Sequence, residues 1–235
     1  MAVARNSVYL MVDSQRIIQE LRDRLELVAV AEDAEPMAAY MKQIAPFLGV
    51  KTPARRAARK PIWTEAKDWT SVELLDVSDA LFEEPEREFH QVACGLLRRW
   101  VKKLDSDDLD RIRRIVQTKS WWDTVDVLAV HVLGPVVRVD RSLQVDMDDW
   151  IEDPDMWVAR CAILHQLLWK DDTDAERLFR YCDLRAEDTE FFIRKAMGWA
   201  LRQHARTDPE AVALYVHENA DRLSGLTKRE ALKHL

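Results

Sequence analysis

A chain of 235 residues is long enough to bury a substantial core, as one large domain or as two small ones. Its 48% hydrophobic and 33% charged residues are typical of a soluble globular protein. The net charge of −7 argues against a polyanionic partner, unless the basic residues gather on one surface. Because only 5 Gly and 8 Pro interrupt long stretches rich in Ala, Leu, Glu, Arg and Lys, the composition favours an all-α fold.

The first predicted element is a helix over residues 6–30, where apolar side chains recur at spacings of three and four. Its apolar patch, residues 7–12, is too short for a signal peptide or a membrane span, so we expect a cytoplasmic protein. Pro36 is expected to open a second helix, and residues 46–53 to form a tight connection.

Capping signals predict the starts of the later helices. In chain order these are Thr52-Pro53 before a basic helix from Ala54, Pro85-Glu86, Ser106, Ser120, Thr173 with Glu176, Asp188 or Thr189, Asp208-Pro209, and Thr227 with Glu230. A further amphipathic helix covers residues 70–82, and Gly134 with Pro135 is expected to end the helix that follows Ser120. About eleven helices joined by short loops predict a helical solenoid, although no sequence repeat is exact.

The sequence Ser-Trp-Trp-Asp-Thr-Val-Asp at residues 120–126 is the strongest candidate for a site. With Ser120 as the helix cap, Trp122 and Asp126 fall at positions i and i+4 and share one face. An aromatic surface beside a carboxylate could receive a cationic, electron-poor substrate, because both favour positive charge. The alternative is that the tryptophans belong to the core and Asp126 is a solvated helix charge.

Cysteines and histidines give no sign of a metal site. The three cysteines are odd in number and lie far apart among helical apolar residues, which favours reduced, buried thiols: Cys94, Cys161 and Cys182. The histidines on predicted helices have no Cys or carboxylate at ligand spacing, which favours packing or surface roles: His131, His165 and His204. We therefore expect no disulfide, metal or cofactor.

Four separated motifs, taken in order, resemble the AlkD-like DNA alkylation repair family over roughly residues 36–234. They are Tyr40-Met-Lys-x4-Phe47-Leu-Gly-Val-x2-Pro53-x-Arg55-Arg56, Ser120-Trp-Trp-Asp-Thr-Val-Asp126, Trp157-x2-Arg160-x-Ala162-Ile163, and Phe191-Phe-Ile-Arg-Lys-Ala-Met-Gly-Trp199-Ala-Leu-Arg202. Glu86-Arg-Glu-Phe89, Leu223-Ser, Arg229-Glu-Ala and Lys233 add support.

The resemblance implies an all-α superhelical solenoid of antiparallel helix pairs, or HEAT-like repeats, with a concave face that binds DNA. It implies one domain over residues 1–235, in which residues 1–35 form an N-terminal capping helix and residues 36–235 form the repeats. The implied activity is that of a monofunctional N-glycosylase, which releases N3- and N7-alkylated purines from duplex DNA without flipping the base. The family also implies a monomer, associated with the nucleoid through DNA.

The resemblance also assigns roles to residues. Trp122 and Asp126 correspond to an aromatic wall and the catalytic carboxylate, and Trp199 corresponds to the second wall. Arg160 corresponds to a residue that holds the DNA backbone near the lesion. The other candidate DNA-binding residues are Tyr40, Lys51, Arg56, Lys170, Arg194 and Lys195, of which Lys195 shares a helix face with Trp199.

The chemistry of the residues is consistent with these roles. Alkylation at N3 or N7 makes the purine a cationic leaving group, so the enzyme need not protonate it. A fixed carboxylate can then stabilise an oxocarbenium-like sugar and present water. A groove that leaves the lesion stacked would also tolerate bulky adducts, which suits self-protection against a DNA-alkylating natural product.

Other interpretations stay open at this point. The chain could be a non-catalytic helical-repeat module that recognises DNA structure, or a protein scaffold. Arg160 could form a structural salt bridge with the acidic residues 146–155, a stretch that would also weaken general DNA affinity. Trp199 could be a core aromatic at a close helix contact, and Trp121, turned about 100° from Trp122, is expected to lie in the core.

Overall fold

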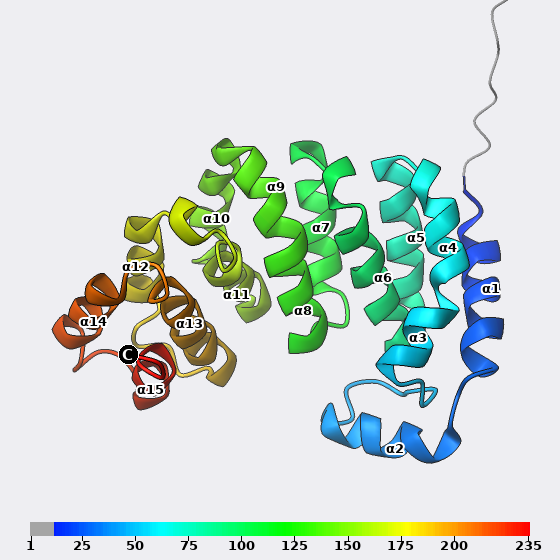
Figure 1. The fold of residues 1–235 in the computed structure, drawn as a ribbon, viewed down its shortest axis with the longest axis horizontal. Helices are drawn as coiled ribbons and strands as arrows, with labels where there is room; N and C mark the ends of the chain where they lie inside the picture. Colours follow the sequence, from blue (N-terminus) through cyan, green and yellow to red (C-terminus); the bar gives the residue numbers. More distant parts are fainter. Residues whose placement is uncertain (1–11) are drawn as a thin grey trace, which may run out of the picture. The chain divides into compact units, whose positions relative to one another are not determined.

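The computed structural model describes residues 12–235, which form helices and connections without a strand (Figure 1). The predicted all-α class is therefore confirmed.

The chain divides into two compact units after Leu96, within helix α6. Helices that begin in the first unit are α1 (Ser14–Glu26), α2 (Ala31–Tyr40), α3 (Thr52–Ala58), α4 (Lys60–Glu65), α5 (Ser71–Glu83) and α6 (Arg87–Arg99). Those of the second are α7 (Leu109–Gln117), α8 (Trp122–Leu128), α9 (Gly134–Val139), α10 (Gln144–Trp150), α11 (Met156–Leu164), α12 (Ala175–Leu184), α13 (Phe191–His204), α14 (Pro209–Glu218) and α15 (Gly225–Ala231).

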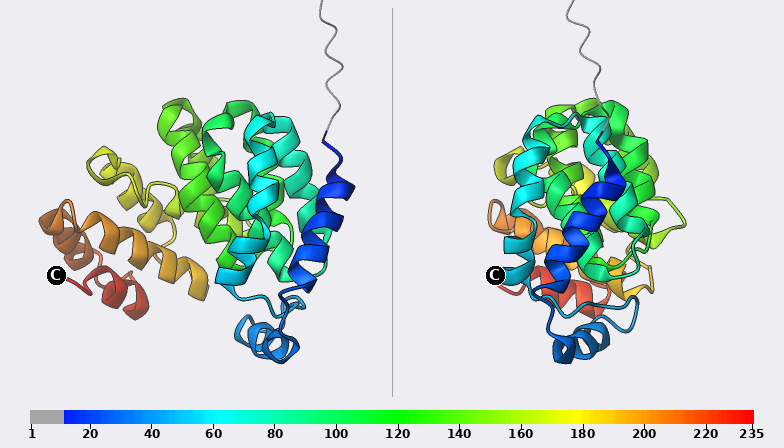
Figure 2. Two further views of the ribbon diagram at one scale, coloured as in Figure 1. Left: turned by 45° about the vertical axis from the view of Figure 1, so that its right-hand side comes forward. Right: turned by 90° about the vertical axis from the view of Figure 1, so that its right-hand side faces the viewer.

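In the first unit, α1 packs against α3 and α5 through an apolar stripe (Figure 2). Ile17, Leu21 and Leu25 on this stripe are fully buried, as the spacing predicts. The helix begins at Ser14 because the Asp13 carboxylate accepts hydrogen bonds from the amides of the first turn. Residues 6–11 of the predicted helix lie outside the described residues.

The predicted connection at residues 46–53 is held by a buried carboxylate. Glu88 on α6 accepts hydrogen bonds from the backbone amides of Leu48, Gly49 and Val50 at 3.0 to 3.1 Å. Gly49 has φ +86, a left-handed conformation that favours glycine, and a Cβ there would lie 2.1 Å from the carbonyl oxygen of Val30. This connection sets the start of α3.

Several predicted helix starts are wrong by a few residues. Pro36 lies inside α2, which begins at Ala31, and α3 begins at Thr52 instead of Ala54. Elsewhere a neighbouring side chain makes the capping hydrogen bond: Asp105 instead of Ser106, Asp174 instead of Thr173, and Ser224 instead of Thr227. Capping residues cluster at these turns, and the sequence alone does not show which of them reaches the free amides.

Other starts are confirmed. Thr70 and Glu73 form a complete capping box at the start of α5, within the predicted helix over residues 70–82. Asp208 caps α14 at the amide of Ala211. On α6, Phe89, Val92, Ala93, Leu96 and Leu97 are buried at the spacing of one helix face.

The predicted end of a helix at Gly134 and Pro135 is wrong, because α8 continues into α9 through a π-helical turn, η4 (Ala129–Leu133). The amide of Gly134 donates to the carbonyl of Ala129 in the wider hydrogen-bond pattern of a π turn. This turn accommodates Pro135, which has no N–H to donate. The resulting long helix carries the candidate site at its start.

Gly134 allows α9 to lie against the end of α11, and Gly134→Ala is expected to destabilise the protein by about 1 to 3 kcal/mol. A Cβ at this position would lie 2.4 Å from the carbonyl oxygen of His165, and backbone cannot move aside easily. Gly225→Ala is the matched control, because its Cβ would meet only the flexible end of Arg229 at 3.3 Å. Urea unfolding of both variants measures the difference, and equal stability would contradict the tight contact at Gly134.

Candidate functional site

The site begins where α7 turns into α8, and the predicted role of Ser120 there is wrong. Its hydroxyl donates to the carbonyl of Val116 at 2.6 Å, so it satisfies the end of α7 instead of capping α8. The residue before α8 is Trp121, in extended conformation, and it makes no side-chain capping hydrogen bond. Trp122 is the first residue of α8 and is half-buried, and Asp126 follows one turn later on the same face.

A cluster of three aromatic rings from three segments lies at the start of α8. Trp121 precedes α8, Trp157 is on α11, and Phe192 is on α13. The ring centroids are 5.7 Å apart for Trp121 and Trp157, 5.1 Å for Trp121 and Phe192, and 4.8 Å for Trp157 and Phe192, all in tilted or edge arrangements. Trp121 packs against the other two rings but is half-buried, as Trp122 is, so its predicted place in the core is wrong. The cluster fixes the spacing of the three segments.

Asp126 and Arg160 form a two-point ion pair across α8 and α11. The Nε of Arg160 donates to Oδ1 of Asp126 at 2.7 Å, and the second terminal nitrogen donates to Oδ2 at 2.9 Å. The other terminal nitrogen donates to the carbonyl of Phe192, so three guanidinium nitrogens have protein partners. The Arg160 side chain is 4% exposed and that of Asp126 is 17% exposed.

This pair excludes the alternative that Arg160 is bound by the acidic residues 146–155. Arg160 holds the plane of the Asp126 carboxylate in a fixed direction, because paired N–H donors match both oxygens. Each carboxylate oxygen retains a further lone pair that can accept from water or face a developing cation. The sequence does not show that Arg160 binds Asp126 or the carbonyl of Phe192, since each of these two residues lies more than thirty residues from Arg160 along the chain.

Helix α13 carries Lys195 and Trp199 on the face next to α15, four residues apart. Trp199 is half-buried, and its neighbour Gly198 makes the close helix contact: a Cβ there would lie 2.5 Å from Cβ of Glu230. The Nζ of Lys195 lies 2.6 Å from Oε1 of Glu230 on α15. Arg202 binds the other carboxylate oxygen of Glu230.

The remaining DNA-binding candidates are on both units. In the first unit, Tyr40 is 73% exposed at the end of α2, Lys51 is ion-paired with Asp33 at 2.7 Å, and Arg56 is exposed on α3. In the second unit, Arg194 donates to the carbonyl of Asp188 at 2.6 Å. Lys170 is exposed in a short turn and has φ 56. Their contacts with DNA remain predictions.

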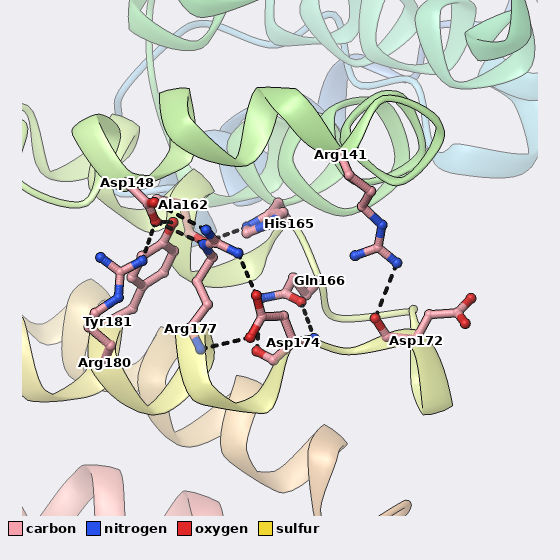
Figure 3. Close-up of polar contacts among 10 residues, drawn as sticks. All are labelled: Arg141, Asp148, Ala162, His165, Gln166, Asp172, Asp174, Arg177, Arg180 and Tyr181. Carbon is pink, nitrogen blue, oxygen red and sulfur yellow. Dashed lines mark hydrogen bonds and ion pairs between the residues drawn. The ribbon is translucent and has the colours of Figure 1, made fainter.

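Two aspartates of the acidic stretch at residues 146–155 are paired with arginines. Asp148 on α10 accepts hydrogen bonds from Arg177, Arg180 and Tyr181 of α12 (Figure 3). Asp153 pairs with Arg113. These two carboxylates join helices, whereas Asp149 is exposed, and the effect of the stretch on DNA affinity stays a prediction.

The stability of the protein is expected to depend on Asp148 in acid. Burial alone would raise the pKa of Asp148, but its hydrogen-bond donors outweigh burial and hold the pKa at about 2. A pKa below the unfolded value near 3.9 gives a stabilisation that is present above pH 4 and lost as the pH falls toward 2. The effect should be on the order of 1 kcal/mol, because solvent screens half-exposed pairs.

Urea unfolding of the wild type and Asp148→Asn from pH 5 to pH 2 measures this dependence. The difference in unfolding free energy between the wild type and Asp148→Asn should become smaller as the pH falls. Asp149→Asn, an exposed neighbour on α10, controls for net charge and should show a small difference at every pH. If the wild type stays more stable than Asp148→Asn by the same free energy down to pH 2, the pH dependence does not come from Asp148.

The three cysteines, His165 and His204 are buried, and His131 is half-buried. All three cysteines are free and buried, and burial raises the pKa of Cys161 and Cys182. His165 is fully buried, its Nδ1 lies 2.6 Å from the carbonyl of Ala162 (Figure 3), and burial lowers its pKa to about 4. Among residues 12–235, no three His, Cys, Asp or Glu side chains are grouped to hold a metal ion. No helix in the same range has the length and hydropathy of a membrane span.

Comparisons with known proteins agree with the motifs. A family model described as "DNA alkylation repair enzyme" matches residues 21–235. The solved structure of a predicted DNA alkylation repair enzyme from Enterococcus faecalis is similar with a TM-score of 0.81 and 31% identity, over 87% of this chain and 95% of that chain. AlkD2 from Streptococcus mutans is similar with a TM-score of 0.65 and 15% identity, over 95% and 99% of the two chains, which shows the fold alone. No curated protein sequence gives a significant match.

Proposed function

The chain belongs to the DNA alkylation repair enzyme family, and we propose that it is a monofunctional glycosylase that releases cationic N3- and N7-alkylated purines from duplex DNA. The observation that carries this proposal is the fixed carboxylate of Asp126, whose side chain is 17% exposed while both of its oxygens accept hydrogen bonds from the buried Arg160. The proposed enzyme acts as a monomer, without metal or cofactor.

The proposed reaction uses the charge of the substrate. An N3- or N7-alkylated purine carries a positive charge, so it departs as a neutral base when the glycosidic bond breaks. Positive charge then develops on the deoxyribose, and Asp126 stabilises it by electrostatics and orients the water that attacks the sugar. The paired N–H groups of Arg160 supply preorganisation, because the carboxylate need not reorient as the charge moves.

We assign two of the half-buried tryptophans, Trp122 and Trp199, to the walls of the proposed DNA-binding groove. The indole faces of Trp122 and Trp199 contact the deoxyribose as its charge develops, and a cation over an aromatic ring is worth about 0.5 to 2 kcal/mol. The lesion stays stacked in the duplex, so no base pocket is required. DNA backbone contacts come from the exposed and half-exposed candidates: Tyr40, Lys51, Arg56, Lys170, Arg194 and Lys195. Arg160, which the family resemblance assigns to the DNA backbone, is instead assigned to holding Asp126, because its side chain is 4% exposed and its guanidinium is paired within the protein.

A lesion panel tests the proposed substrate class. Duplexes with one N7-methylguanine, N3-methyladenine or bulky cationic N3 adduct are compared with a duplex that carries neutral O6-methylguanine. The cationic lesions should be released as free bases and the neutral one retained. Release of the bulky adduct would support a role in self-protection, and release of the neutral lesion would refute the mechanism.

One observation favours a second function, that of a non-catalytic helical-repeat protein scaffold. Lys51 and Lys195 are held in ion pairs with Asp33 and Glu230, which lowers the positive charge available to phosphates. Such a scaffold would bind the lesion duplexes weakly and would release no base. The same panel therefore distinguishes the two functions.

A further inference from the structure

Glu230 on α15 holds two cations of α13 in one place. Its Oε1 lies 2.6 Å from Nζ of Lys195, and its Oε2 binds Arg202, which also donates to the backbone carbonyl of Glu230 at 3.2 Å. Lys195, Trp199 and Arg202 stand at positions i, i+4 and i+7 of α13, so they share one face. The carboxylate thus spans the two cations that flank Trp199.

The position of Glu230 is set by the backbone and by packing. Gly198 lets α15 approach α13, and the Thr227 hydroxyl donates to the carbonyl of Arg194 at 3.2 Å. Ser224 caps α15 at the amide of Thr227. Figure 1 shows the two helices side by side, consistent with their direct contact. Glu230 therefore meets Lys195 as part of a rigid helix pair.

The Glu230 side chain is negatively charged at any pH at which the protein would bind DNA. Hydrogen bonds from Lys195 and then from Arg202 lower the pKa of Glu230 to about 2. Lys195 is 39% exposed, so a phosphate can reach it, whereas the Glu230 side chain is 16% exposed. A phosphate that approaches Lys195 therefore meets the carboxylate of Glu230, which is already paired with this lysine.

We propose that Glu230 occupies Lys195 in place of a DNA phosphate and thereby limits the affinity of the protein for undamaged duplex. This inference rests on the proposed function in DNA repair. When DNA binds, a phosphate competes for Lys195, while Arg202 retains Glu230. The competition lowers nonspecific binding, because a neutralised lysine releases fewer counterions from DNA.

Salt-dependent binding of Glu230→Gln to an unmodified duplex tests the proposal. The variant should bind about fivefold more tightly at 0.1 M salt, the size of one exposed ion pair. The slope of log K against log salt should steepen by about 0.9, because one more phosphate is neutralised. Glu218→Gln on α14 is the matched control: it removes the same charge from an exposed residue and should leave the slope unchanged.

Lys195→Ala identifies the cation involved. It should weaken binding strongly in the Glu230→Gln background and weakly in the wild type. If Glu230→Gln unfolds, Glu230→Asp serves instead, since the shorter side chain releases Lys195 and should steepen the slope by a smaller amount.

Equal slopes for Glu230→Gln and Glu218→Gln, with clear DNA binding by all variants, would overturn the proposal and leave the proposed function intact. Absence of salt-dependent binding in every variant would overturn both.

Discussion

Asp126→Asn is expected to reduce the release of N7-methylguanine from duplex DNA by about two to three orders of magnitude, the loss typical when a preorganised electrostatic group is removed from a transition state. The amide keeps the shape of the side chain but loses its negative charge. It can still accept one hydrogen bond from Arg160, so the variant should fold. Single-turnover kinetics with enzyme in excess measures the bond-breaking step directly.

Asp148→Asn is the matched control for Asp126→Asn. It also removes a carboxylate that is paired with arginine, from α10 instead of α8. It should lower stability and leave the rate of base release within about twofold of the wild type, since surface pairs act on folding and not on the reaction. Equal rates for Asp126→Asn and Asp148→Asn would remove Asp126 from the mechanism.

Arg160→Lys is expected to slow base release by about 100-fold, because a lysine cannot hold both oxygens of Asp126 and a small misplacement of a catalytic group is costly. Arg160→Ala should also destabilise the protein by about 3 to 5 kcal/mol, the cost of breaking a buried ion pair by removing one partner. Urea unfolding and single-turnover rates, measured on the same preparations, separate the two effects.

Two outcomes distinguish positioning from DNA contact at Arg160. If Arg160 positions Asp126, Arg160→Lys slows the reaction at saturating enzyme and leaves the salt dependence of DNA binding unchanged. If Arg160 instead binds a DNA phosphate, Arg160→Lys lowers the affinity for DNA, and its rate of base release at saturating enzyme stays near that of the wild type. In the Asp126→Asn background, Arg160→Lys should have little further effect on the rate, since residues that act as a unit are not additive.

The sequence predicts the all-α class, the buried face of α1 and the shared face of Trp122 and Asp126, because each depends on spacing within a helix. It fails where two neighbouring polar residues compete for a cap, as at Thr173 and Asp174. It also fails at Pro135, where a π turn absorbs a residue that usually ends a helix.

The partners within the site depend on tertiary packing. Arg160 meets Asp126 across 34 residues, and Lys195 meets Glu230 across 35. Each of these residues is visible in a motif, but the motif does not show which opposite charge it faces. Local sequence thus identifies the candidates, and the packing of α8, α11, α13 and α15 determines their partners.

The products that the wild-type protein forms from one defined duplex with a single N7-methylguanine test the glycosylase activity itself. With enzyme in excess, we expect free N7-methylguanine, an abasic site and an intact strand, formed much faster than spontaneous loss of the base. If the protein binds this duplex and the base is lost only at the spontaneous rate, the proposed glycosylase activity is wrong.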